Sequence, residues 1–493
     1  MGRDPVWKNV SIAPPRPTVD NERWEGGIMP GSRKNDVSRQ GRRRAPLPPE
    51  PRRVNVNAAG IDIGAGHHYV AVPEGRDPEG RAVRQFGCFT DDLCALADWL
   101  SQCGIETVAM ESTGVYWIPL YELLAERGFD VKLVDPRRLK NVPGRKTDVL
   151  DCQWIQQLHT FGLLSGAFRP DDQICVLRSY LRQRAMLVRY ASDHIRHMQK
   201  ALEQMNVKLT QVVTDITGVT GMGIIRAILG GERDPKRLAA LRDERCKNTE
   251  ETIARALEGN WRSEHLFELR QAVELVDFYQ KQLAACDKAI EAHLRRFEDK
   301  SDGQELPVSR KPKSRRGDPG FDARLHLLRL TGVDLTTIDG IEAHTALKVV
   351  SEIGVDMSRW RDEKCFASWL GLSPGSKITG GKLLSGRTKP CANRAATALR
   401  LAAWSLHRSR SALGAYYRRM KARLGPAKAI TATAHKLARL IYRMMKFGTT
   451  YVDRGQDYYE LRYRDRILRN ISRRARELGY TLVKSDELSL VPA

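Results

Sequence analysis

Four acidic residues occupy positions where their type and spacing suggest a chemical role. Asp62 interrupts the apolar run GIDIG, and Glu111 ends the apolar run VAME. Burying a charged carboxylate without a partner is costly, so both positions suggest a role beyond packing. Asp148 and Asp151 are three positions apart in a segment with a helical pattern, so both side chains project from one helix face.

A group of carboxylates suits phosphodiester chemistry, because two Mg²⁺ ions about 4 Å apart can hold a scissile phosphate and stabilise the attacking and leaving oxygens. Hard oxygen ligands favour Mg²⁺ (or Mn²⁺) over zinc. Each residue alone also has a structural explanation: acids at strand ends cap helices, and paired acids line solvated helix faces. Together, Asp62, Glu111, Asp148 and Asp151 predict a catalytic metal site.

The elements that would position these carboxylates form one α/β domain. Short apolar runs ended by Gly, Pro or acidic residues predict strands, and apolar residues at helical spacing predict the helices between them. The predicted order is βββαβαβ, with strands in 55–64, 67–74, 83–89, 105–111 and 130–135 and helices in 91–104 and 116–128. A final helix would begin near Thr147, whose hydroxyl can cap it.

The rest of the chain is mostly helical in pattern. Two long, arginine-rich stretches, 174–209 and 264–297, lack Pro and Gly and carry an apolar stripe. Each resembles half of an antiparallel pair or of a dimerising coiled coil. The predicted domains are a disordered basic arm (1–53), a catalytic domain (54–170), a helical connector (171–299), a linker (300–322), a C-terminal domain (323–455) and a basic helical tail (456–493).

The C-terminal domain opens with LTTIDGIEAHTALKVVSEIG, in which Gly340 lies at a turn before a helix. This spacing is that of a helix-hairpin-helix, whose backbone N–H groups contact DNA phosphates without reading sequence. A plain helical turn explains the same segment about as well.

Composition indicates the kind of partner. The 493 residues include 82 Lys and Arg against 59 Asp and Glu, a formal charge of +23. This excess favours nucleic acid, although a basic protein can also keep its charge for solubility. No stretch approaches the ~20 apolar residues that span a bilayer, which predicts a cytoplasmic protein without a membrane partner.

Several of these segments resemble one family. GIDIG, AMESTGVYWIPLYELL, VDPRRLKNVPGRKTDVLD, GLSPGSKITGGK and NRAATALRLAA are similar to the insertion sequence 110 family of DEDD transposases, from about residue 55 to 452. The resemblance implies a RuvC-like (ribonuclease H-like) N-terminal domain, a coiled-coil connector and a C-terminal transposase domain. It makes the four carboxylates the acidic tetrad of a bacterial, nucleoid-associated enzyme that cuts and rejoins DNA at element ends and target. It also implies a structured guide RNA.

The resemblance further implies a serine nucleophile in the C-terminal domain that bonds transiently to DNA. Here the chain departs from the family pattern, because KITGGK has Thr379 before the glycines. Threonine carries the same hydroxyl with a stiffer χ1. We rank Thr379 first, then Ser376, then Ser385; the alternative is a glycine-rich loop that only contacts phosphate.

Basic and amide side chains near both motifs are candidates for holding the DNA backbone and the developing negative charge. Single arginines here can also just coat a basic surface. The candidates are Arg145, Lys146, Lys382, Arg387, Lys389, Asn393 and Arg394.

Competing interpretations remain open at this stage. A RuvC-like junction-resolving endonuclease would keep the tetrad without strand transfer, and a coiled-coil nucleic-acid-binding protein would use it only structurally. His194 and His197 form an HxxH pair, but no third metal ligand lies nearby in the sequence. Joining two DNAs needs more than one active site, so we expect a homodimer or tetramer.

Overall fold

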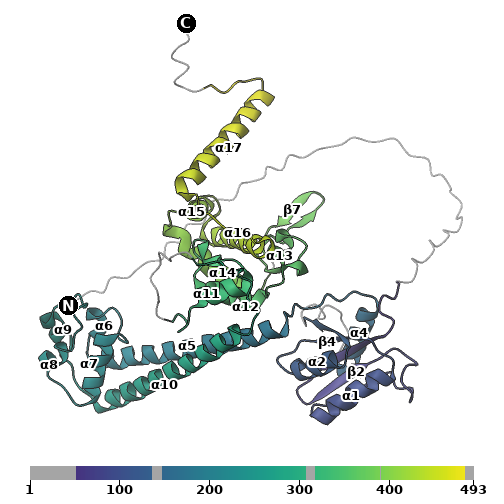
Figure 1. Ribbon diagram of the computed structural model, residues 1–493, viewed down its shortest axis with the longest axis horizontal. Coiled ribbons are helices and arrows are strands. Elements are labelled where there is room, and N and C mark those ends of the chain that lie inside the picture. Colours follow the sequence, from purple (N-terminus) through teal and green to yellow (C-terminus); the bar gives the residue numbers. More distant parts are fainter. Residues whose placement is uncertain (1–51, 136–146, 307–316, 389, 484–493) are drawn as a thin grey trace, which may run out of the picture. The chain divides into compact units, whose positions relative to one another are not determined.

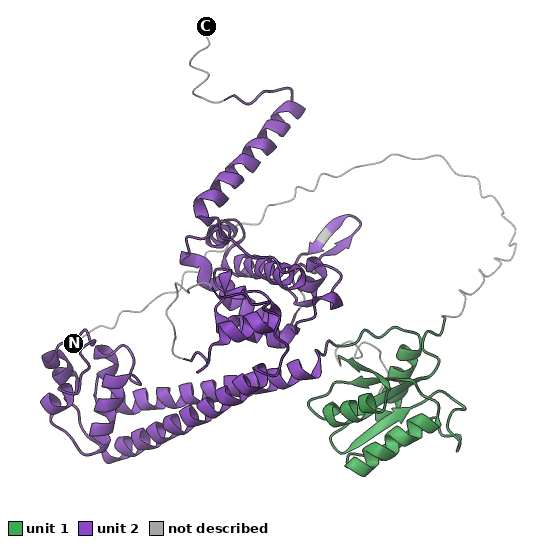
Figure 2. Cartoon of the chain, in the orientation of Figure 1, with its two compact units in different colours: residues 1–167 green, residues 168–493 purple. Residues whose placement is uncertain are grey.

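The structure is a computed structural model that describes residues 52–135, 147–306, 317–388 and 390–483. The chain divides into two compact units, residues 1–167 and residues 168–493, which Figure 2 colours separately. Each unit is described by itself below. Most of the predicted basic arm, the centre of the predicted linker and the last ten residues lie outside the described ranges.

The first unit is built on a five-stranded mixed sheet (Figure 1). Its strand order is β3-β2-β1-β4-β5: β1 pairs antiparallel with β2 and parallel with β4, and β4 pairs parallel with β5. The strands are β1 Ala58–Ile63, β2 His67–Ala71, β3 Val83–Gly87, β4 Thr107–Glu111 and β5 Asp130–Val134.

Helices cover both faces of this sheet, because alternate strand residues bury apolar side chains on opposite sides. Helices α1 (Thr90–Gln102) and α2 (Trp117–Glu126) share a core with Ile61, Val108 and Met110. On the opposite face, Ile155 of α4 (Asp148–Thr160) packs with Ala109 and Val134. The sequence-predicted order of strands and helices is confirmed, and the mixed sheet with its helices is consistent with a ribonuclease H-like fold.

The second unit begins with two long helices, α5 (Asp172–Gln204) and α10 (Ser263–Leu294), which lie side by side in Figure 1. They run antiparallel, because His293 near the end of α10 lies 2.8 Å from the carbonyl oxygen of Gln173 at the start of α5, and Tyr279 packs against Tyr190 further along. The structure therefore contains the antiparallel pair, whereas a dimerising coiled coil through these helices stays a prediction.

The far end of this pair has a core of its own. Four short helices connect α5 to α10 there: α6 Leu209–Val212, α7 Val219–Leu229, α8 Pro235–Ala239 and α9 Glu250–Ala256. Their apolar side chains, such as Ile225 and Leu238, pack with Met198 of α5 and Val273 of α10. We call this cluster the arm tip.

The near end of the pair shares one core with the C-terminal helices. Ile174, Leu177 and Leu294 are buried together with Leu347 and Leu399. This region comprises α11 Ala323–Thr331, η1 Leu335–Thr337, α12 Ala343–Ile353, η2 Met357–Arg359, α13 Glu363–Trp369, α14 Arg394–Ser405, η3 Leu406–Arg408, α15 Ala412–Leu424, α16 Pro426–Phe447 and α17 Gly455–Glu477. The base of the arm is therefore part of the C-terminal core, although the sequence suggested a linker between separate parts.

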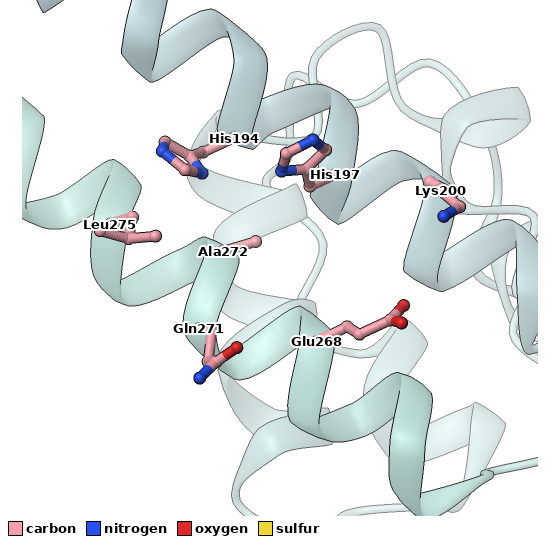
Figure 3. Close-up of a pocket in the computed structure, with 7 residues that line it drawn as sticks. All are labelled: His194, His197, Lys200, Glu268, Gln271, Ala272 and Leu275. Carbon is pink, nitrogen blue, oxygen red and sulfur yellow. The ribbon is translucent and has the colours of Figure 1, made fainter.

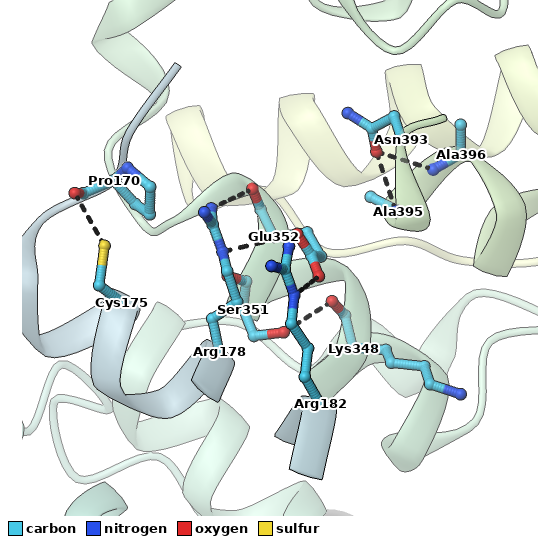
Figure 4. A network of polar contacts seen from close by, with 10 residues as sticks. All are labelled: Pro170, Cys175, Arg178, Arg182, Lys348, Ser351, Glu352, Asn393, Ala395 and Ala396. Atoms are coloured by element: carbon cyan, nitrogen blue, oxygen red, sulfur yellow. Dashed lines mark hydrogen bonds and ion pairs between the residues drawn. The ribbon is translucent and has the colours of Figure 1, made fainter. Parts of the chain in front are cut away.

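Polar contacts reinforce this junction (Figure 4). Arg178 of α5 donates to the carbonyl oxygens of Ser351 and Glu352 at the end of α12, and Arg182 donates to the Glu352 carboxylate at 2.8 Å. The buried Arg184 pairs with Asp287 of α10 and also donates to the carbonyl oxygens of Gly317 and Asp318. None of the helices in the described residues is both long and apolar enough to cross a membrane.

Candidate active site

Asp62 and Glu111 come together at the carboxyl ends of two parallel strands. The register pairs Ile61 of β1 with Met110 of β4, so Asp62 and Glu111 occupy the next position on each strand. Because side chains alternate along a strand, both project from the face opposite the Ile61 and Met110 core, which is the face that α4 covers. The Thr113 hydroxyl donates to the Glu111 carboxylate at 3.0 Å.

Helix α4 brings Asp148 and Asp151 to the same edge. It runs antiparallel to β1: the Gln156 side chain donates to the Ala58 carbonyl oxygen, and the helix backbone at Cys152 and Gln156 lies against Gly60. Its first turn therefore lies beside the end of β1, where Asp62 stands. Thr147 caps this turn by accepting from the Leu150 N–H, as predicted.

The approach of α4 to β1 depends on a glycine. A Cβ atom at position 60 would lie 2.2 Å from the Gln156 backbone nitrogen and 2.4 Å from the Cys152 carbonyl oxygen. Both are backbone atoms and cannot rotate away. Gly60 thus lets the helix that carries two of the acids lie directly on the strand that carries the third.

The four carboxylates, which we call the carboxylate cluster, are near enough to influence one another electrostatically. The pKa of Asp62 is raised from 3.8 to about 6, first by burial and then by the negative charges of Glu111, Asp148 and Asp151, against a lowering contribution from the Ile63 backbone N–H. Like charges disfavour ionisation of a neighbour, whereas a nearby cation would reverse the shift. The cluster therefore concentrates negative charge at the end of β1.

The donor set suits a hard divalent cation, because it consists of carboxylate oxygens. Among the described residues, however, no group of three or more His, Cys, Asp or Glu side chains is drawn together tightly enough to form a ready-made metal site. The carboxylates thus fit Mg²⁺ in chemistry and charge, and metal binding would have to draw their side chains inward.

The three candidate hydroxyls lie on or beside a β-hairpin of the second unit, visible beside α13 in Figure 1. Strands β6 (Lys377–Thr379) and β7 (Lys382–Ser385) are joined by Gly380 and Gly381, both with positive φ (55° and 76°). Two such residues match a tight hairpin turn. Thr379 pairs with Lys382 next to the turn.

The surroundings of the three hydroxyls differ. Thr379 and Ser376 are exposed, whereas Ser385 is partly buried and accepts a hydrogen bond from the Arg387 N–H at 3.3 Å. The hairpin was not predicted from the sequence, which suggested at most a glycine-rich loop here. The signal was present, because Gly-Gly between KIT and KLLS is a two-residue hairpin turn.

The predicted nucleic-acid contacts separate into different groups. Lys382, Arg387 and Arg394 are exposed. Asn393 instead caps helix α14: its side-chain oxygen accepts from the backbone N–H groups of Ala395 (2.9 Å) and Ala396 (3.2 Å), as Figure 4 shows. Arg145, Lys146 and Lys389 lie outside the described residues.

Gly340 lies between η1 and α12 with a φ of 85°. A Cβ atom there would lie 3.0 Å from both the Ala402 carbonyl oxygen and a Leu406 methyl group. The glycine is therefore required by the close approach of the end of α14 and the start of η3. Contact of this turn with a phosphate remains a prediction.

The HxxH pair lines a pocket of about 280 Å³ between α5 and α10, together with Glu268 (Figure 3). The His194 ring stacks on Tyr279, with ring centroids 5.5 Å apart. In the part of the chain that the structure describes, these side chains belong to no group of three ligands suited to a metal. The pair has a packing role in the arm.

Comparison with known families assigns a class to this arrangement. Residues 59–207, which include the carboxylate cluster, match a family model for transposases of the DEDD, IS110 type. Residues 334–418, which include the hairpin, match a model described as the transposase IS116/IS110/IS902 family. A search of curated proteins found no match.

Both matched regions thus describe a transposase, an enzyme class whose partner is DNA. The two models match in order along the chain and concern one family. Two separate regions of the chain therefore match models of the IS110 type of transposase.

Proposed function

We propose that this transposase cuts and rejoins DNA with the carboxylate cluster and a hydroxyl of the β6–β7 hairpin. The observation that carries the proposal is the register of β1 and β4, which places Asp62 and Glu111 side by side, with the first turn of α4 beside the end of β1. The raised pKa of Asp62 supports it. Dense negative charge beside a DNA phosphate is unfavourable unless cations intervene.

Asp62, Glu111, Asp148 and Asp151 would hold Mg²⁺ (or Mn²⁺). When bound, such ions polarise a phosphodiester and stabilise the oxygens that attack and leave. The fold positions these carboxylates: β1 and β4 carry Asp62 and Glu111, and the capped first turn of α4 carries Asp148 and Asp151. Without a bound cation, burial and the neighbouring negative charges raise the pKa of Asp62 to about 6, which a bound cation would offset.

The nucleophile would be Thr379, with Ser376 and Ser385 as alternatives. Its hydroxyl oxygen forms a bond to a DNA phosphorus, the bond from that phosphorus to the leaving oxygen breaks, and the hydroxyl proton is passed on to the leaving oxygen. Exposure of Thr379 beside a tight turn supports this role, because DNA can reach it. Lys382, which pairs with Thr379, and Arg387 would hold the phosphate.

Covalent trapping tests this mechanism. The full chain is incubated with labelled DNA of its element ends, the flanking transcript and Mg²⁺, and protein–DNA adducts are separated under denaturing conditions. We expect an adduct that Thr379→Ala abolishes, that Thr379→Ser retains, and that Ser376→Ala and Ser385→Ala leave intact. Asp62→Asn should prevent the adduct but retain DNA binding.

Other outcomes have clear meanings. Loss of the adduct in Ser376→Ala or Ser385→Ala would move the nucleophile to that residue. DNA cleavage without any adduct would contradict the hydroxyl mechanism and favour a RuvC-like hydrolytic endonuclease. Binding without cleavage at any Mg²⁺ concentration would favour a non-enzymatic DNA-binding protein.

We further propose a structured RNA guide as a partner, supported by the resemblance to the family and by the charge of +23. Backbone recognition of RNA needs positive charge more than a sequence motif. Omitting the flanking transcript from the trapping reaction should abolish adduct formation. Equal yields with and without that RNA would contradict the guide.

A further inference from the structure

Helix α17 ends the described chain with an apolar surface that the rest of the unit leaves open. Its first turns pack on the C-terminal helices, where Tyr459 contacts Tyr416 and lies near Lys436. In Figure 1 the rest of α17 runs away from α15. None of the residues of α17, all of which the structure describes, is buried.

The exposed surface has a regular repeat. Leu461, Leu468 and Ala475 are seven residues apart, and Arg464, Ile471 and Leu478 fall between them at alternating spacings of three and four. This is the a and d pattern of a coiled coil. Leu461, Leu468, Ile471 and Leu478 are between 44% and 75% exposed. Most of the stability of a helix in a protein comes from packing of its apolar face, so the exposed stripe calls for a partner helix.

We propose that α17 pairs with α17 of a second copy of this chain as an antiparallel coiled coil. The repeat is self-complementary about its centre: with Leu468 facing Ile471 of the second copy, Leu461 faces Leu478 and Arg464 faces Ala475. A parallel pair would instead place Arg464 against its own copy. Two arginines at one core position repel, whereas alanine leaves room for the arginine stem.

Flanking charges favour the same direction. In the antiparallel arrangement, Glu460 of each copy lies beside Arg474 of the other copy, so two such pairs form. In the parallel arrangement, Glu460 would lie beside Asp465. Opposite charges at these flanking positions select partner and orientation. Charge complementarity therefore singles out a second copy in antiparallel register, and the outer arginines Arg462, Arg466 and Arg469 remain available to nucleic acid.

The pairing does not rest on the proposed chemistry, so association can be measured alone. The full-length protein, free of nucleic acid, is examined by size-exclusion chromatography with light scattering. We expect Ile471→Glu to halve the mass of the associated species, because it places two glutamates in the central layers. The matched control Asn470→Glu, on the neighbouring outward position, should leave the mass unchanged. Because α17 buries no side chain within its own chain, both variants should keep the helical signal of the rest of the unit in circular dichroism, and only Ile471→Glu should lose part of the α17 contribution.

A charge swap tests the direction of the pair. Glu460→Arg and Arg474→Glu should each weaken association, and the two together should restore it. A parallel pair predicts the opposite for the first variant, since Glu460→Arg would then face Asp465. The proposal is overturned by a wild-type protein that has the mass of one chain at all concentrations, or by an Ile471→Glu protein that associates normally. It is also overturned if Ile471→Glu changes only DNA or RNA binding.

Discussion

Gly60 of β1 lies against the backbone of Gln156 of α4 with no room for a side chain between them. This contact sets the distance between the strand that carries Asp62 and the helix that carries Asp148 and Asp151. The site therefore depends on a residue that takes no part in its chemistry.

Gly60→Ala should damage both stability and activity. The added Cβ would lie 2.2 Å from the Gln156 nitrogen, so α4 must move. Overpacking of this kind costs about 1–3 kcal/mol. The unfolding temperature and the rate of DNA cleavage should both fall. Gly66→Ala is the control, because nothing lies within 4 Å of its Cβ position. Equal behaviour of the two variants would refute the role of Gly60.

Asp62 should make stability depend on pH. Its pKa is raised from 3.8 to about 6, so the folded state binds the proton more tightly than the unfolded state. The stabilising contribution of this proton is full below the unfolded pKa and is lost as pH rises through about 6. In the absence of divalent cations, Asp62→Asn should therefore raise the unfolding temperature at pH 7 but not near pH 4.

Mg²⁺ should reverse this difference. A ligand that binds only the folded state stabilises it, so Mg²⁺ should raise the unfolding temperature of the wild type at pH 7 and do so much less in Asp62→Asn. Calorimetry with Mg²⁺ titrations checks this without any DNA. An identical Mg²⁺ response in both proteins would mean that Asp62 does not hold the ion.

Asn393 should act as a helix cap. It accepts from the Ala395 and Ala396 N–H groups, so Asn393→Ala should cost about 1 kcal/mol in the free energy of unfolding, and Asn393→Ser should restore most of it. Urea denaturation measures both. If Asn393→Ser is stable but loses DNA affinity, the asparagine contacts nucleic acid as the sequence first suggested.

The Arg184–Asp287 pair should hold α5 and α10 together at the base of the arm. Their side chains are 3% and 11% exposed, so Arg184→Ala leaves a buried carboxylate without its partner. Breaking such a pair costs about 3–5 kcal/mol. Replacing both residues, with Arg184→Met and Asp287→Leu, should recover much of that loss in urea denaturation. A double variant no more stable than Arg184→Ala would show that the backbone contacts of Arg184 dominate.

Sequence reasoning went furthest in the first unit. Short apolar runs located the strands that carry Asp62 and Glu111, whereas the parallel pairing that places both at one edge came from the structure. The Thr147 cap was also predictable, because a hydroxyl directly preceded a helical pattern. What the sequence lacked was the packing of Gly60, since a glycine in a strand does not reveal which backbone approaches it.

In the second unit, long-range packing limited what could be predicted from the sequence. The stripes on α5 and α10 suit a partner in the same chain or in another, and contacts such as that of Tyr190 with Tyr279 show that the two helices pair within one chain. Likewise, Ile174 and Leu399 are far apart in sequence but are buried in one core. The composition of the linker suggested that the arm and the C-terminal helices are separate, and it could not reveal this shared core. Whether the Thr379 hydroxyl meets the carboxylate cluster is also a question of long-range packing, and their meeting is part of the proposed function.

The arm tip has its own core, which gives α5 and α10 a fixed far end. At about 1.5 Å per residue, the 33 residues of α5 span about 50 Å. The arm therefore sets a fixed separation between its tip and the C-terminal helices, and a nucleic acid or protein bound at the tip would be held at that separation. Lengthening the arm by whole turns in both helices would change that length while keeping each face in phase.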